Sequence, residues 1–133
     1  MSIIESWLSY SVSKAAFLMS YRCLALELAP SILVGSCKPG IVDTEMQTEM
    51  RQATETAFPK VSYFKKLKME KDKVFDPSKH TKPHVPSREH LDTPENVAHF
   101  VWWLIHDTTA EEYPSQDWDI RDPLLAARWV KWE

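Results

Sequence analysis

The sequence predicts an α/β domain in which helices pack on a few parallel strands. Residues 9–28 are helix-compatible throughout, contain neither glycine nor proline, and stop just before Pro30. The run ILVGSC at 32–37 follows at once, and its branched apolar residues are typical of a strand buried on both faces. A helix, a short link and a buried strand make half of a strand–helix–strand unit. We therefore expect residues 1–133 to form a single partial domain with few parallel strands and several helices.

The first predicted helix is apolar on nearly all sides, apart from a thin stripe of Ser13, Ser20 and Glu27. A helix of this kind is expected to pack against two neighbours, such as a sheet and a further helix or a second subunit. Little chain is available for a strand before it, and Ile3 and Ile4 are our candidates for a remnant of that strand.

Two polar segments follow the predicted strand. Residues 44–57 read as a polar helix with a weak apolar edge. From about 58 to 91 the apolar periodicity is lost and lysines are frequent, so we interpret this segment as a variable, substrate-loop-like excursion anchored by Phe58, Tyr63 and Phe64.

Regular structure is predicted again from residue 92. Asp92-Thr93-Pro94-Glu95 is a helix start with a capping candidate and a proline in the first turn. Residues 118–120 favour a short strand, and Asp122-Pro123 begins a last helix. The apolar side of that helix is expected to consist of Leu124, Leu125, Trp129 and Trp132.

Composition narrows the function classes. A net charge of −3 gives no reason to expect nucleic acid, and no apolar run is long enough to cross a membrane. The start lacks the pattern of a secretory signal, which points to a cytosolic protein. Cys23 and Cys37 lie in apolar runs, where we expect them buried and reduced, with a single disulfide as the alternative.

The low glycine content excludes one kind of site, a glycine-rich phosphate-binding loop, more firmly than any other feature of the composition. The sequence has only two, Gly35 and Gly40. A loop that cradles the phosphates of a dinucleotide needs several glycines close together, so that the backbone can approach the phosphates. These residues therefore contain no such loop.

Tyr10 and Lys14 are four residues apart, which places them on one helix face. A free phenol has a pKa of about 10, and a nearby ammonium lowers it by stabilising the phenolate. A phenol adjusted in this way can donate a proton to a carbonyl oxygen or accept one from an alcohol. The spacing alone equally fits a tyrosine packed at a helix start beside a solvated lysine.

The stretch YSVSKAA, the apolar helix, the short strand and PGIVDTEM together resemble the carboxyl-terminal half of the short-chain dehydrogenase/reductases. DTPENVAHFVWWLI and DWDIRD resemble the late helix and final strand of that family. PGIVDTEMQ is similar to its sepiapterin- and benzil-reductase-like branch. The resemblance implies a Rossmann-type, doubly wound fold, an NAD or NADP cofactor, and a small carbonyl or alcohol substrate.

The resemblance also implies roles for the matching positions. Tyr10 is the general acid/base, and Lys14 lowers its pKa and binds the nicotinamide ribose. Pro39 and Gly40 shape the turn beside the nicotinamide, the Ile41 backbone meets its carboxamide, and Thr44 contacts the cofactor. A plain turn at Pro39 and Gly40, and helix capping by Asp43 or Thr44, are the structural alternatives.

Two parts of the family pattern have no counterpart. The glycine-rich loop is missing, and the catalytic serine, about a dozen residues before the tyrosine, has no match at Ser2, Ser6 or Ser9. We therefore expect a truncated domain that is inactive alone, with no bound cofactor as one alternative. The other function classes are a non-catalytic remnant and a module that forms homo-oligomers through the helix 10–28.

Other chemistry is less well supported. His80, His84 and His90 share one segment, but their spacing matches no structural zinc site, so we expect polar loop histidines and no metal. The lysines between Lys60 and Lys82 are interrupted by Glu70, Asp72 and Asp76, which favours a solvated loop over contact with nucleic acid.

Overall fold

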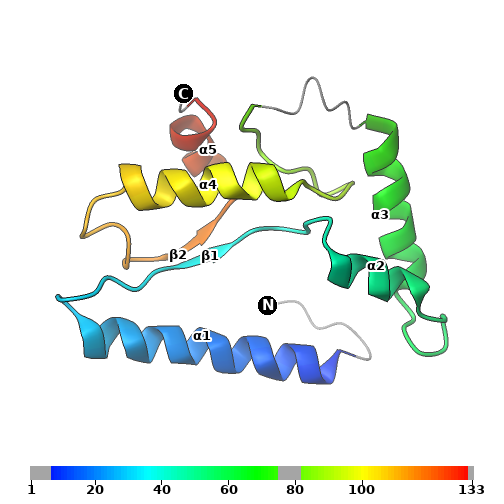
Figure 1. Ribbon diagram of the computed structural model, residues 1–133, viewed down its shortest axis with the longest axis horizontal. Helices are drawn as coiled ribbons and strands as arrows, with labels where there is room; N and C mark the ends of the chain where they lie inside the picture. Colours follow the sequence, from blue (N-terminus) through cyan, green and yellow to red (C-terminus); the bar gives the residue numbers. More distant parts are fainter. Residues whose placement is uncertain (1–6, 75–81, 132–133) are drawn as a thin grey trace.

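The computed structural model describes residues 7–74 and 82–131 (Figure 1). Ile3, Ile4, Ser2, Ser6, His80 and Trp132 lie outside the described residues. The elements, in chain order, are α1 (Leu8–Leu28), β1 (Ser36–Lys38), α2 (Glu45–Gln52), α3 (Val61–Val74), α4 (Pro94–Asp107), β2 (Asp117–Asp119) and α5 (Pro123–Trp129).

The sheet is parallel, as predicted, and has two strands within the described ranges. Ser36 lies opposite Asp117, and Lys38 lies opposite Asp119. The predicted strand at 32–37 was placed too early, because Ile32 and Leu33 are exposed and β1 begins only at Ser36. A strand persists only where a neighbour completes its hydrogen bonds, and β2 is opposite three residues of β1. The result is a partial α/β arrangement; a doubly wound sheet goes beyond what these strands show.

The main core joins the sheet to the last two helices. Figure 1 shows α4 and α5 on one side of the strands and α1 on the other. We call this cluster of buried residues the carboxyl-terminal core: Phe100, Trp103, Leu104, Trp118, Ile120, Leu125 and Trp129. Three of these residues are tryptophans, and each packs stacked or edge to face with an aromatic neighbour. Such ring pairs stabilise the folded state beyond what the burial of their area contributes.

The caps of the two late helices are as predicted. The Thr93 hydroxyl accepts a hydrogen bond from the Asn96 amide, and the Asp122 carboxylate accepts one from the Leu124 amide. A proline occupies the first turn of each helix, where its missing N–H costs nothing. The predicted apolar side of α5 is confirmed for Leu125 and Trp129 and is wrong for Leu124, which is exposed.

The excursion at 58–91 is more regular than predicted, because it contains α3. A second cluster of buried residues, the α3 core, consists of Phe58, Val61, Phe64, Leu67 and Leu91. The first four recur three residues apart, so Val61, Phe64 and Leu67 lie along one side of α3. Lys60, Lys65 and Lys66 are among the residues between them. Phe58 and Phe64 are anchors as expected, whereas Tyr63 is exposed.

The helix α1 has nearly the predicted bounds but not the predicted packing. None of its residues is buried, although two packed faces were expected. Its half-buried residues are Ser11, Leu18, Tyr21, Ala25 and Leu28, which lie on one face. The side chains of Leu8, Phe17 and Leu26 are exposed, the last to 83%. Cys23 on α1 is exposed too, against expectation, and both cysteines are free thiols.

Candidate functional site

Tyr10 and Lys14 lie in the first turns of α1, and the helix brings them together as predicted. The Lys14 ammonium is 5.5 Å from the centre of the Tyr10 ring and 6.0 Å from that of Phe17. These are cation–π contacts, in which the ammonium lies against the ring faces. Tyr10 is 36% exposed, so solvent or a small molecule can reach the ring.

Trp7 anchors this end of α1 to the α3 core. Its ring stacks on Phe58 at 5.5 Å and on Phe64 at 5.8 Å between centroids. It also contacts the Tyr10 ring at 4.6 Å. The tyrosine is therefore linked through the Trp7 ring to α3 and the turn before it.

The segment after β1 carries the other predicted residues. Gly40 has φ +76, a left-handed conformation that side chains rarely adopt, and the nearest side-chain atom to a Cβ there would be 3.7 Å away. The glycine is therefore required by backbone conformation and not by lack of space. Pro39 and Thr44 are exposed, and Ile41 is half-buried against the α3 core.

Ile41 and Trp7 pack against the same cluster, so the structure brings the segment 39–44 and the start of α1 to one end of the molecule. Figure 1 draws this end with α2 above the start of α1. In the part of the chain that the structure describes, no hydrogen bond, ion pair or ring contact joins Tyr10 or Lys14 to Pro39, Gly40 or Thr44.

Thr44 occupies the capping position of α2, but its side chain makes no capping hydrogen bond. In the first turn of the same helix Gln47 is 4% exposed, and its Oε1 has no hydrogen-bond partner among the described residues. A buried oxygen without a donor is costly, so this atom favours a donor supplied by water or a ligand.

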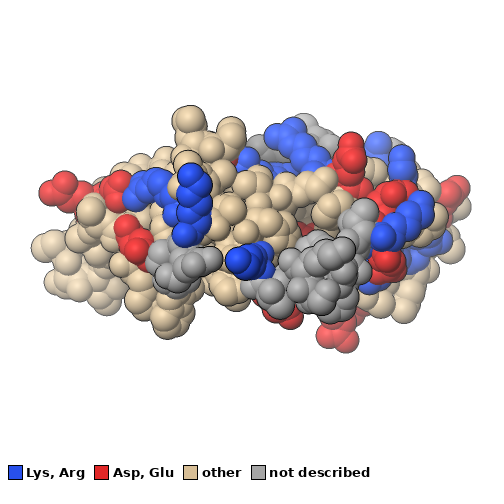
Figure 2. Space-filling view, turned by 90° about the horizontal axis from the view of Figure 1, so that it is seen from above, with Lys and Arg blue, Asp and Glu red and all other residues tan. Residues whose placement is uncertain are grey.

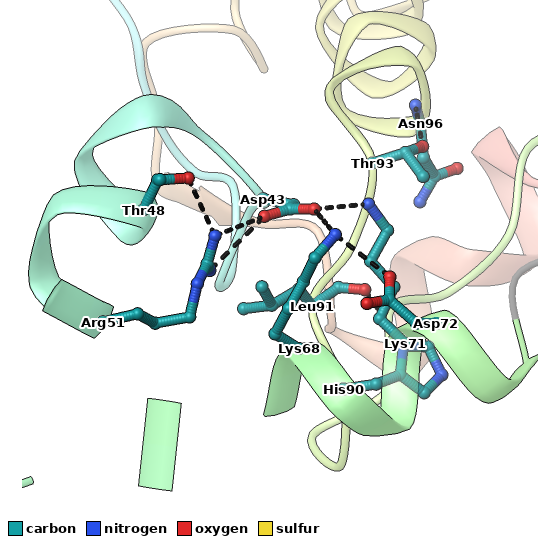
Figure 3. Close-up of polar contacts among 10 residues, drawn as sticks. All are labelled: Asp43, Thr48, Arg51, Lys68, Lys71, Asp72, His90, Leu91, Thr93 and Asn96. Carbon is teal, nitrogen blue, oxygen red and sulfur yellow. Dashed lines mark hydrogen bonds and ion pairs between the residues drawn. The ribbon is translucent and has the colours of Figure 1, made fainter. Parts of the chain in front are cut away.

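Asp43 does not cap α2. Instead its carboxylate is the centre of a charge cluster (Figure 3). Lys68 and Lys71 of α3 lie 2.8 and 2.7 Å from Oδ2, and Arg51 of α2 lies 3.5 Å from Oδ1. Burial pushes the pKa of Asp43 up, but the hydrogen bonds from both lysines outweigh it and hold that pKa below its usual value. The carboxylate thus ties α2 and α3 to the segment after β1.

These partners of Asp43 were missed from the sequence. The ion pairs join residues 8 to 28 positions apart, whereas helical spacing predicts pairs only three or four positions apart. Viewed from above, the end of the molecule formed by α2 and α3 shows basic and acidic side chains side by side (Figure 2). The lysines of the predicted solvated loop are thus partly engaged in pairs on a helix.

We searched the described residues for metal sites, membrane-spanning helices and reactive thiols. Within residues 7–74 and 82–131, no three His, Cys, Asp or Glu side chains gather as a metal site would require. None of the described helices combines the length and hydropathy needed to cross a bilayer. Burial raises the pKa of the Cys37 thiol, and Asp117 adds to the effect, so this cysteine is a poor nucleophile at neutral pH.

One family model matches part of the chain. Residues 2–55 match the family model described as short chain dehydrogenase. The match covers less than half of the 133 residues, and it contains both the Tyr10–Lys14 pair and the segment from Pro39 to Thr44. No curated protein and no solved structure matched the chain. Over its matched residues the chain is therefore similar to an oxidoreductase family.

Proposed function

We propose that the chain is a short-chain oxidoreductase-like protein that carries the catalytic Tyr–Lys pair and the nicotinamide side of an NAD(P) site. One observation carries this proposal: the stretch that matches the family contains two segments, and both pack against the α3 core through Trp7 and Ile41. The residue just before α1 and the turn proposed to hold the nicotinamide thus pack on the same cluster of side chains, which supports the proposal.

The proposed chemistry follows from the side chains. Tyr10 exchanges a proton with the oxygen of a small carbonyl or alcohol, and Lys14, whose ammonium lies 5.5 Å from the centre of the Tyr10 ring, binds the nicotinamide ribose. The nicotinamide cofactor supplies or accepts the hydride when it is bound. A narrower form of the proposal places the protein in the sepiapterin- and benzil-reductase-like branch, in the cytosol, with carbonyl reduction as the reaction.

The residues after β1 fit the nicotinamide part of the cofactor. Gly40 forms a turn without a side chain, the Thr44 hydroxyl is exposed without a capping bond, and Gln47 Oε1 lacks a donor. They do not fit its phosphates, because Gly35 and Gly40 are the only glycines in the sequence. In our proposal the phosphate loop and the catalytic serine come from outside these residues.

Titration of the full chain with NADH and NADPH, followed by nucleotide fluorescence, tests the proposal. We expect weak saturable binding, and we expect Lys14→Met to weaken it about tenfold, which is ~1.4 kcal/mol. Arg22→Met is the matched control, since Arg22 is another exposed cation on α1. If the wild type binds neither nucleotide saturably, the chain is not an oxidoreductase by itself.

The second proposed function is self-association through α1. The observation in its favour is that a helix of 21 residues with a largely apolar surface buries none of them. Large exposed apolar patches mark interaction sites, because leaving them in water is unfavourable. In this proposal a second copy covers the outer face of α1, in a homo-oligomer.

Sedimentation velocity at micromolar concentration tests the second function. We expect a dimer or larger species for the wild type and a monomer for Leu26→Lys. Leu124→Lys is the control, because Leu124 is equally exposed but lies on α5. A monodisperse wild-type monomer with a sharp thermal transition would exclude it.

A further inference from the structure

His84 lies between two hydrogen-bond acceptors. Its Nε2 is 3.1 Å from Oδ1 of Asp92, and its Nδ1 is 3.2 Å from the carbonyl oxygen of Lys82. A neutral imidazole has one N–H, so one of these oxygens would face a nitrogen lone pair. The doubly protonated ring donates to both. The arrangement therefore matches the imidazolium and not either neutral tautomer.

The polar groups around the ring form a buried network. Asp92 is 2% exposed, and its Oδ2 accepts a hydrogen bond of 2.8 Å from Nδ2 of Asn96. The Asn96 side chain also accepts from the backbone amide of His84 and donates to its carbonyl, at 3.0 and 2.8 Å. Asn96 is itself buried in the first turn of α4. The His84 side chain, at 31% exposed, is the part of this network that water reaches.

The network is joined to the proposed nicotinamide side through the backbone of Asp92. The Asp92 amide donates to the Ile41 carbonyl, and the Asp43 amide donates to the Asp92 carbonyl, each at 2.9 Å. Val42 and Asp92 thereby form an isolated parallel bridge. Asp92 thus contacts His84 through its side chain and the segment 41–43 through its backbone.

We propose that His84 is a pH-operated latch: with both ring nitrogens protonated it holds residues 82–84 on Asp92, and loss of a proton loosens the bridge between Asp92 and residues 41–43. The charged groups involved are the Asp92 carboxylate against the ring and the ammonium of Lys82 two residues away. Asp43, on the bridged segment, is engaged by cations of α2 and α3. Glu95 and His99 are the titratable groups of α4 nearest in sequence to Asn96.

The direction of the pH response follows from the contacts. The hydrogen bond to Asp92 raises the pKa of His84 more than burial lowers it, and the Lys82 carbonyl adds to the rise. A histidine whose pKa is raised on folding contributes stability that is fully present below its ordinary value of about 6.5. That contribution is lost as the pH rises through the higher pKa of the folded state. The latch is therefore closed below the ordinary histidine value and opens as the pH rises through the raised pKa of folded His84.

The test is an NMR titration of the full chain, with long-range ¹H–¹⁵N spectra that report both ring nitrogens of each histidine. We expect His84 to be doubly protonated at low pH, with a midpoint above the ordinary value. In Asp92→Asn the midpoint should fall by about one pH unit, because the opposite charge is removed. His106 is the internal control, since its ring contacts a backbone carbonyl of its own helix and no carboxylate in the described structure.

Amide hydrogen exchange measures whether the bridge between Asp92 and residues 41–43 loosens. In the wild type, the amides of Asp43 and Asp92 should lose protection as the pH passes the His84 midpoint, beyond the intrinsic change of exchange with pH. In His84→Gln that step should vanish, while His106→Gln should keep it. A His84 midpoint at or below the ordinary value, or protection of the two amides that ignores the midpoint, would overturn the proposal. Both results are obtained on the wild type, so the test does not depend on the folding of any variant.

Discussion

The helices α1 and α4 have similar apolar character but opposite surroundings. α4 buries Asn96, Phe100, Trp103 and Leu104 against the sheet and α5, and its first turn is capped by Thr93. α1 is longer, has no side-chain cap and buries no residue. Apolar residues with good helical propensity thus suffice to form both helices, whereas burial depends on the neighbours that the fold provides.

This difference bears on function, because Tyr10 and Lys14 lie on the less buried of the two helices. The aromatic contacts of Trp7 fix only one end of α1. The well-packed half of the molecule, by contrast, contains none of the proposed catalytic residues. A partner surface for α1 would therefore stabilise the proposed site directly, and each of the following changes tests one side of this contrast.

The largest effect is expected in the carboxyl-terminal core. Trp118→Ala removes a side chain that is 2% exposed and whose indole N–H donates to the Tyr113 carbonyl at 2.9 Å. It should lower the free energy of unfolding by about 3–5 kcal/mol, measured by urea denaturation. Trp102→Ala, at a residue 53% exposed on α4, is the matched control and should cost far less. Similar losses for both would mean that this core is not closely packed.

A smaller effect is expected at the charge cluster that joins the two regions. Asp43→Asn leaves Arg51, Lys68 and Lys71 without their shared carboxylate, which should cost about 2 kcal/mol in the same assay. Asp72→Asn is the control, because Asp72 pairs only with Lys68 among the contacts described and is largely exposed.

The Asp43 contribution also has a pH signature. Because the pKa of Asp43 is lowered on folding, its stabilisation is present above the ordinary carboxyl value of about 3.9 and is lost as the pH falls through the lower folded value. The difference in stability between wild type and Asp43→Asn should therefore shrink in acid. A difference that stays constant down to the lowest pH at which the protein folds would contradict the assignment of the charge to this cluster.

The smallest effect on global stability is expected at the anchor of α1. Trp7→Ala removes the stacking on Phe58 and Phe64, which we expect to cost about 1 kcal/mol. Its clearer consequence should be local: hydrogen exchange throughout α1 accelerates, while α4 keeps its protection. Leu8→Ala, one residue along and exposed, should leave α1 unchanged. If α1 keeps its protection without Trp7, other contacts hold the helix.

Local signals predicted several elements. The length of α1 followed from the absence of glycine and proline up to Pro30, and the starts of α4 and α5 followed from capping residues next to proline. α3 was not predicted from the sequence. Its buried residues recur at a spacing of three, but the exposed lysines nearby make the segment polar on average. The strand β1 was misplaced, because pairing with β2 and not apolar character decides where it begins.

The candidate site also combines features that the sequence predicted with contacts that it did not predict. The spacing of Tyr10 and Lys14 and the turn at Pro39 and Gly40 are local properties, and the sequence indicated both; the positive φ of Gly40 came from the structure. The partners of Asp43 and the contact of His84 with Asp92 were not, because they join distant residues or a loop to a helix start. Helical or strand periodicity does not predict such pairs, because the backbone between the two residues can adopt many conformations.

The sequence by itself determined the helix that carries Tyr10 and Lys14, the caps of the late helices and the absence of a glycine-rich loop. Each of these depends on residues within a few positions of one another. The tertiary structure alone decided that Trp7 and Ile41 share one core, that Asp43 gathers cations from α2 and α3, and that α1 leaves most of its apolar surface exposed. The reason is physical: burial and charge pairing depend on which surfaces meet, and local sequence does not specify the meeting of distant surfaces.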